Sequence, residues 1–191
     1  VRFNYRESGA GTDSKYKGSK VDVSYFNGTQ TEFILKNGVE IPSDIDWVIV
    51  KTKGFIKELF YFYKFDLKSK VRKTHDASSI LFNGQLNAVP FVIFDLLFAG
   101  SKNVKVFHSD LMLTKGRTMG YYPKTSYYEN DERTRFLISV VGHDPVTQFR
   151  FLSLMFSQDS IKGDEMFEKV MRMTCKKYMD ELDSTYNEAN S

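Results

Sequence analysis

The chain has 191 residues, of which 41% are apolar and 27% are charged. This composition is typical of a globular domain and excludes a disordered chain, a collagen-like repeat and a disulfide scaffold. The net charge of +3, from 27 basic and 24 acidic side chains, does not indicate nucleic-acid binding. Cys175 is the single cysteine, so a reducing, cytoplasmic compartment fits best. No apolar run approaches the length of a membrane span, so we expect neither a transmembrane helix nor a signal peptide.

The first half of the chain alternates short apolar runs with polar loops. Strands are expected over residues 1–4, 20–26 and 46–51. A short helix is expected over 31–36, and the aromatic stripe over 55–70 predicts an amphipathic helix. The basic patch over 64–73 has two interpretations: the solvated end of that helix, which we favour, or a surface for anionic lipid or polymer at the inner face of a membrane.

The second half begins with a segment, 86–99, that is apolar nearly all round. It predicts a buried helix, with Pro90 in its first turn and Gly100 as its C-cap. Residues 103–107 predict a buried strand, and the polar residues 108–110 follow at its carboxyl end.

Two helices are expected in the last third of the chain, after an apolar strand over 136–141. Asp144 as N-cap and Pro145 at the first helical position predict a helix that runs to residue 156. Apolar residues four apart between 166 and 182 predict one final helix of about five turns, within a helical segment over 160–191.

Alternation of apolar strands with helices indicates an α/β fold, with a mostly parallel sheet covered by helices on both faces. Ligands of such folds bind beyond the carboxyl ends of the strands. His143, which precedes a capped helix, could act there as a general base or could simply pack against the helix start. Asn4 and Asn27 each end a strand, where an amide could hold a ribose or phosphate or could only form a turn.

Other candidate chemistries are weaker. Tyr121 and Tyr122 belong to a tyrosine-rich loop, and their hydroxyls could donate to a departing phosphate or only pack a lid. His75, His108 and Asp110 do not stand at metal-ligand spacing. Ser109 lacks the flanking glycines of a nucleophile elbow, so a hydrolase triad is poorly supported.

Several of these segments, in this order, resemble the sialyltransferases, both bacterial and eukaryotic-type, which transfer a sugar from a CMP donor. The resemblance covers roughly residues 1–156. It is carried by the opening VRFN, the stretch YKGSK at 16–20, YFN at 25–27, the segment from Phe82 through Asp110, and Gly142–His143. The resemblance implies a Rossmann-like variant of the GT-A fold that lacks its first βα unit, so that the chain would begin after that unit and transfer weakly or not at all alone.

The resemblance also implies roles. His143 would deprotonate the acceptor hydroxyl in a metal-independent inverting displacement, and Tyr121 and Tyr122 would stabilise the leaving phosphate. The donor nucleotide would be held by residues at the strand ends and helix starts, namely Asn4, Asn27, Asn83, Gly84, Gln85, Asn87, Asp110 and Gly142. Residues 1–156 would form the nucleotide-sugar-binding domain and 157–191 a helical extension. Gln85 stands where the bacterial enzymes carry an arginine, which leaves the donor sugar open. The partners would be a nucleotide sugar and a glycan acceptor, with no separate cofactor; the alternative is a non-catalytic partner-binding module.

Overall fold

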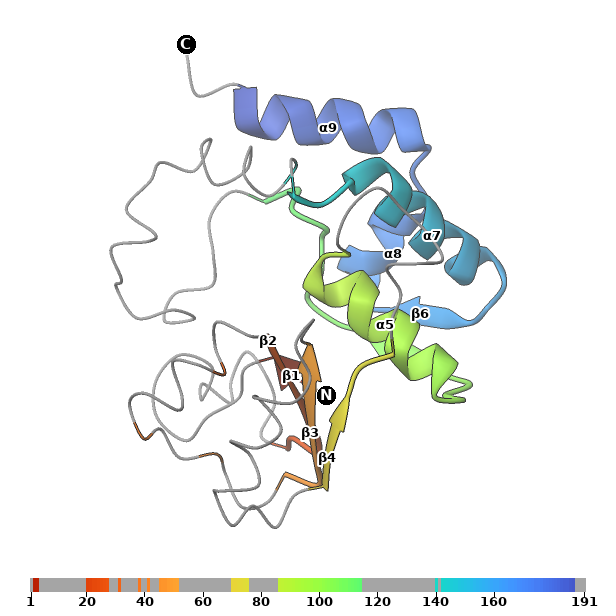
Figure 1. Ribbon diagram of the computed structural model, residues 1–191. Helices are drawn as coiled ribbons and strands as arrows, with labels where there is room; N and C mark the ends of the chain where they lie inside the picture. The colour runs from red at the N-terminus through yellow and green to blue at the C-terminus, as the bar shows by residue number, and fades with distance from the viewer. Residues whose placement is uncertain are drawn as a thin grey trace. The chain divides into compact units, whose positions relative to one another are not determined.

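A computed structural model describes residues 2–3, 20–27, 31, 38, 41, 45–51, 70–75, 86–114, 140 and 142–187. Within these residues the protein is a mixed α/β structure with parallel strands (Figure 1). The chain divides into two compact units. The sheet unit comprises Val1–His75 with Thr118–Thr125, and the helical unit comprises Asp76–Arg117 with Ser126–Ser191.

The sheet unit contains four parallel strands in the order β1-β2-β3-β4. They are β1 (Arg2–Phe3), β2 (Val23–Asn27), β3 (Trp47–Lys51) and β4 (Lys70–Lys73). The first three confirm the strands predicted from the sequence. Phe3 is in register with Tyr25, and Asn27 is in register with Lys51, so the carboxyl ends of these strands meet at one edge of the sheet.

Both faces of this sheet are buried at β3. Val48, Ile49 and Val50 are each at most 2% exposed, and successive side chains of a strand point to opposite faces. One face forms a core of Phe26, Ile45, Val48 and Val50. A strand covered on both faces is a near-continuous apolar run, which is why the sequence predicted it.

β4 corrects one prediction. Residues 70–73 were expected to be the solvated end of a helix, but they form a strand whose Val71 pairs with Val48. The segment carries Lys70, Arg72 and Lys73, and its single apolar residue shows no period, so only the pairing with β3 defines it. The Lys70 ammonium lies 5.4 Å from the centre of the Trp47 ring, a cation–π contact. The helix predicted over 31–36 is described only at Thr31, which is helical, and the one over 55–70 lies outside the described residues except Lys70.

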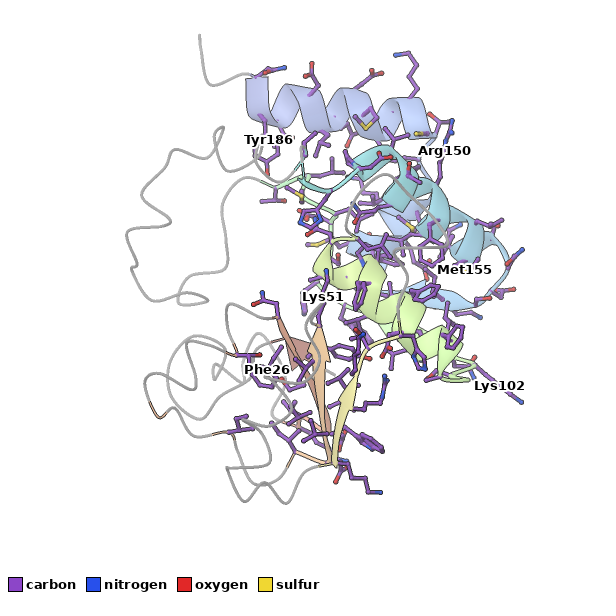
Figure 2. The ribbon with its side chains drawn as sticks, in the orientation of Figure 1. Phe26, Lys51, Lys102, Arg150, Met155 and Tyr186 are labelled. Carbon is purple, nitrogen blue, oxygen red and sulfur yellow. The ribbon has the colours of Figure 1, made fainter. Side chains whose placement is uncertain are left out.

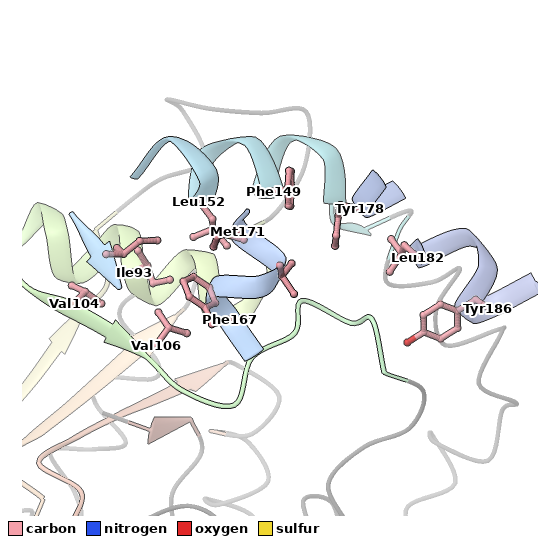
Figure 3. Packing of buried hydrophobic residues seen from close by; sticks show 12 residues of the cluster. Ile93, Val104, Val106, Phe149, Leu152, Phe167, Met171, Tyr178, Leu182 and Tyr186 are labelled. Atoms are coloured by element: carbon pink, nitrogen blue, oxygen red, sulfur yellow. The ribbon is translucent and has the colours of Figure 1, made fainter. Parts of the chain in front are cut away.

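The helical unit packs helices on a two-stranded parallel sheet. Its elements are α5 (Ala88–Phe98), β5 (Val104–Val106), α7 (Pro145–Ser157), β6 (Ile161–Gly163), α8 (Glu165–Met171) and α9 (Cys175–Asn187). One hydrophobic cluster joins all six, and Figure 3 shows its packing. The cluster includes Leu152, which precedes the expected boundary at residue 156, and Phe167, Tyr178 and Leu182, which follow it. The carboxyl-terminal segment therefore packs directly on the preceding helices.

The predicted carboxyl end of α5 and the predicted start of α7 are both confirmed. Gly100 has φ +90° and its N–H donates to Leu97 O, while the N–H of Ser101 donates to Leu96 O. This is a Schellman motif, in which glycine adopts the left-handed conformation at little cost. Asp144 caps α7 by accepting from Thr147 N (3.1 Å), with Pro145 next in the chain.

The predicted single helix at the carboxyl end is wrong. Residues 161–163 form a strand parallel to β5, and α8 and α9 are separate helices. Thr174 caps α9, because its Oγ1 accepts from Lys177 N (3.1 Å), and this cap begins a new helix although the four-residue spacing continues through it. Gly163 is required by close packing, since a Cβ there would lie 2.4 Å from Cδ1 of the buried Phe167.

The strand predicted over 136–141 is also wrong where it can be compared. Val140 has helical backbone, as does Gly142, whereas the residues before Val140 lie outside the described part of the chain. A short apolar run occurs both in strands and in buried helical turns, so the periodicity of the sequence could not distinguish the two structures. Within the described ranges, no helix is long and apolar enough to cross a membrane.

Candidate functional site

A pocket of about 220 Å³ opens in the helical unit. It is formed by the start of α5, the segment after β5, the turn before α7 and one face of α9. The lining residues are Asn87, Ala88, Val89, Pro90, His108, Ser109, Asp110, Leu111, Met112, Val140, His143, Pro145, Gln148, Phe149, Tyr178 and Leu182. The pocket therefore brings together Asn87, Asp110 and His143, which the sequence proposed separately.

The start of α5 presents backbone N–H groups without a side-chain cap. Asn87 occupies the N-cap position with extended backbone, but its side chain does not cap the helix. Instead, Asn87 Nδ2 points to Met112 Sδ (3.6 Å). The N–H groups of a helix start carry partial positive charge, and an uncapped start favours an anion. Ala88 and Val89, whose N–H groups belong to this first turn, line the pocket.

The start of α7, by contrast, already holds a carboxylate. Asp144 accepts from the Thr147 N–H (3.1 Å) and from the Thr147 hydroxyl. The hydroxyl hydrogen bond lowers the pKa of Asp144 below its ordinary value, partial burial opposes this, and the backbone N–H donors add to the lowering. The carboxylate neutralises this helix start, so of the two helix starts at the pocket, that of α5 is the one suited to a ligand anion.

Gln148 joins the two helix starts. Its Oε1 accepts from Asn87 N (2.7 Å), and its Nε2 donates to Asp144 O (3.0 Å). Gln148 is 7% exposed, so these hydrogen bonds form in a part-buried setting. Gln148 thus sets the spacing between α5 and the turn that carries His143.

The segment after β5 has an unusual backbone. His108, Leu111 and Met112 have φ of 53°, 51° and 77°. Left-handed backbone is uncommon for residues other than glycine, and it persists where surrounding contacts hold it. Two contacts hold this one: Asp110 Oδ1 accepts from Met112 N (3.0 Å), and the Tyr178 hydroxyl donates to Leu111 O (2.9 Å). Burial, with the charge of Asp110 adding to it, raises the pKa of Tyr178, so its hydroxyl remains a donor.

Asp164 anchors this segment from the other side. Its Oδ2 accepts from His108 N (2.8 Å), its Oδ1 accepts from Phe167 N (3.0 Å), and its own N–H donates to Val106 O (3.1 Å). Partial burial acts to raise the pKa of Asp164, but the N–H groups of His108 and Phe167, together with the charge of His108 and the residue's own N–H, lower that pKa overall. The carboxylate therefore stays ionised and couples the end of β5 to the start of α8.

The remaining predicted site residues do not meet at this pocket. Asn27 ends β2 with an exposed side chain, and it belongs to the sheet unit. Gly142 is exposed and does not line the pocket. Asn4, Asn83, Gly84, Gln85, Tyr121 and Tyr122 lie outside the described residues.

Sequence reasoning missed Gln148 and Asp164 and gave no ligand role to His108. Asp164 carries a local signal, because an Asp before an acidic first turn is typical of a helix start. Gln148 carries none, because its partner Asn87 is 61 positions away in the chain.

Among the residues that the structure describes, no group of three or more His, Cys, Asp or Glu side chains is placed to hold a metal ion. In comparisons with family models, with curated proteins and with solved structures, the chain matches none of them. The pocket and its lining residues are therefore the features of this chain that bear on its function.

Proposed function

We propose that the protein is a glycosyltransferase that moves a sugar, sialic acid or a related one, from a CMP-activated donor to a glycan hydroxyl, within a Rossmann-like fold. The observation that carries the proposal is the pocket in which His143 meets the uncapped start of α5, Asn87 and Asp110. A base, an anion-binding helix start and polar groups for a nucleotide are the elements that such a transfer needs.

The α5 start is suited to the phosphate of the donor. The N–H groups of Ala88 and Val89 lie in the first turn, where the helix dipole favours negative charge. The Asn87 amide adds a donor at the same place. Asp110, in the segment after β5, also lines the pocket, and its carboxylate oxygens are acceptors for ribose hydroxyls or a base amine.

In the proposed reaction, His143 takes the proton of the acceptor hydroxyl as that oxygen bonds to the anomeric carbon of the donor sugar. The bond from the anomeric carbon to the phosphate oxygen breaks, and its electron pair leaves with CMP. The phosphate gains negative charge in this step, which the α5 start stabilises. Tyr121 and Tyr122 are proposed as donors to that phosphate on the basis of the family resemblance.

The test compares His143→Ala with His75→Ala in the same chain. His75 follows β4 in the sheet unit and lies outside the pocket, so it is a matched histidine control. We expect CMP to bind both variants as it binds the unchanged protein, measured by calorimetry. Whatever transfer from a CMP-sugar the chain carries out, measured as CMP released per acceptor, should be lost in His143→Ala and kept in His75→Ala. Full transfer by His143→Ala, or no CMP binding by the unchanged protein, would refute the proposal.

Exposed apolar side chains in the helical unit support a second candidate, a non-catalytic partner-binding module. Phe98 and Phe107 are each 61% exposed, and Leu154 is 52% exposed. Phe98 lies on α5, Phe107 directly follows β5, and Leu154 lies on α7. A module of this kind predicts that CMP leaves the melting temperature unchanged, so the calorimetric experiment separates the two candidates.

A further inference from the structure

His108 is a second histidine in the pocket, and neither the sequence nor the proposed transfer assigned it a ligand. It lies two residues after the end of β5, and its side chain, 73% exposed, lines the same pocket as His143. Ligands of parallel α/β structures bind at this carboxyl end of a strand. The position of His108 is therefore that of a residue that meets a ligand at the mouth of the pocket.

The backbone of His108 is held in a conformation that its side chain disfavours. A φ of 53° is left-handed backbone, which glycine adopts more readily than a residue with a Cβ. The hydrogen bond from His108 N to Asp164 Oδ2 (2.8 Å) fixes this backbone, and Asp164 is itself anchored to Val106 and Phe167. The imidazole is therefore projected from a rigid support at a site where glycine would be easier to accommodate.

The ring also has a defined electrostatic neighbour. His108 Nδ1 lies 4.0 Å from Asp164 Oδ2, the carboxylate that is kept ionised by its backbone donors. An imidazole carries an N–H donor in its neutral form and two in its charged form. Together with the first turn of α5, which lines the same pocket, this places a side-chain donor and backbone donors around one volume of about 220 Å³.

We propose that His108 binds the phosphate of a nucleoside monophosphate moiety in this pocket, by donating an imidazole N–H to a phosphate oxygen. The inference rests on the proposed function, since it assigns the phosphate subsite of the same pocket. Asp164 positions the backbone of His108, because its carboxylate accepts the His108 N–H.

The chain has three histidines, which makes the test direct. The imidazole Cε1–H signals of the full chain are assigned by single His→Gln variants and are followed while CMP, cytidine or inorganic phosphate is added. CMP and inorganic phosphate should each shift the His108 signal in a saturable way. Cytidine, which has no phosphate, should leave that signal in place.

The second arm uses His108→Gly, which removes the imidazole and suits the left-handed backbone, so the fold is retained. We expect about tenfold weaker CMP binding, the loss of one hydrogen bond to a charged group, at an undiminished melting temperature. Asp159→Gly is the matched control: Asp159 also has positive φ (54°), at the end of α7 and outside the pocket, so it should bind CMP unchanged.

The outcomes separate this inference from the proposed function. If CMP shifts His143 but not His108, and His108→Gly binds CMP within twofold of the unchanged protein, the role of His108 is refuted while the transferase proposal stands. If inorganic phosphate shifts His108 but CMP does not bind, the phosphate contact stands and the CMP-dependent transferase is refuted. A His108 signal that moves equally with cytidine, or with none of the three probes, overturns the phosphate assignment.

Discussion

Gln148 is the residue whose replacement should most clearly show how the pocket is held together. Replacement by methionine keeps the length of the side chain but removes the acceptor for Asn87 N and the donor to Asp144 O. Asn87 N then loses its partner in a part-buried setting, which costs about 1–3 kcal/mol. Asp144 O loses less, because it still accepts from the backbone N–H at position 148 (3.2 Å). We therefore expect Gln148→Met to lower the free energy of unfolding by about 2 kcal/mol.

The measurement is urea unfolding followed by far-ultraviolet circular dichroism, which reports on the helices α5, α7, α8 and α9. Gln158→Met is the control, because Gln158 ends the same helix with an exposed side chain and should change stability by less than about 0.5 kcal/mol. CMP binding should weaken in Gln148→Met, since the spacing of the two helix starts is no longer fixed. Equal stability of the two variants would show that Gln148 does not join α5 to the turn at Asp144.

Two further predictions concern stability. Lys51, labelled at the end of β3 in Figure 2, has its pKa lowered by burial from 10.5 to about 8. Between these two pH values the unfolded chain binds more protons than the folded protein, so the free energy of unfolding should rise with pH across that window. Lys51→Met should remove this rise of stability with pH and should stabilise the protein at pH 7 by at most about 3 kcal/mol. The measurement is thermal unfolding between pH 7 and 9.5, and a rise of stability with pH that survives the substitution would contradict the burial of the ammonium. Asp159→Gly should raise the melting temperature, because the residue ends α7 with φ 54° while the N–H groups of residues 159 and 160 donate to Phe156 O and Met155 O. A lower melting temperature would mean that the exposed Lys162–Asp159 pair (3.6 Å) outweighs the strain.

The sequence determined the elements whose signals are local. β3 was predictable because a strand buried on both faces is an unbroken apolar run, and α7 was predictable because Asp144 and Pro145 mark its start. The end of α5 at Gly100 follows from the conformational freedom of glycine. His143, Asn87 and Asp110 were also found locally, each as a polar residue at a strand end or helix start.

The tertiary structure decided what depends on distant partners. β4 is a strand because β3 pairs with it, and its own charged sequence gives no period. The carboxyl-terminal segment holds β6 and two helices because β5 pairs with residues 161–163 and Thr174 caps a new helix, although the spacing of apolar residues is continuous. Strand pairing and long-range hydrogen bonds cost conformational entropy, which only the contacts of the assembled core offset. No local sequence pattern therefore predicts them.

The pocket belongs to this second class. Its lining comes from four segments between residues 87 and 182, and Gln148 joins two of them across 61 positions. The left-handed backbone of His108 exists because Asp164, 56 positions away, accepts its N–H. The sequence by itself supplied the candidate side chains, whereas the structure decided which of them share one volume, because that depends on contacts between parts of the chain that are far apart in sequence.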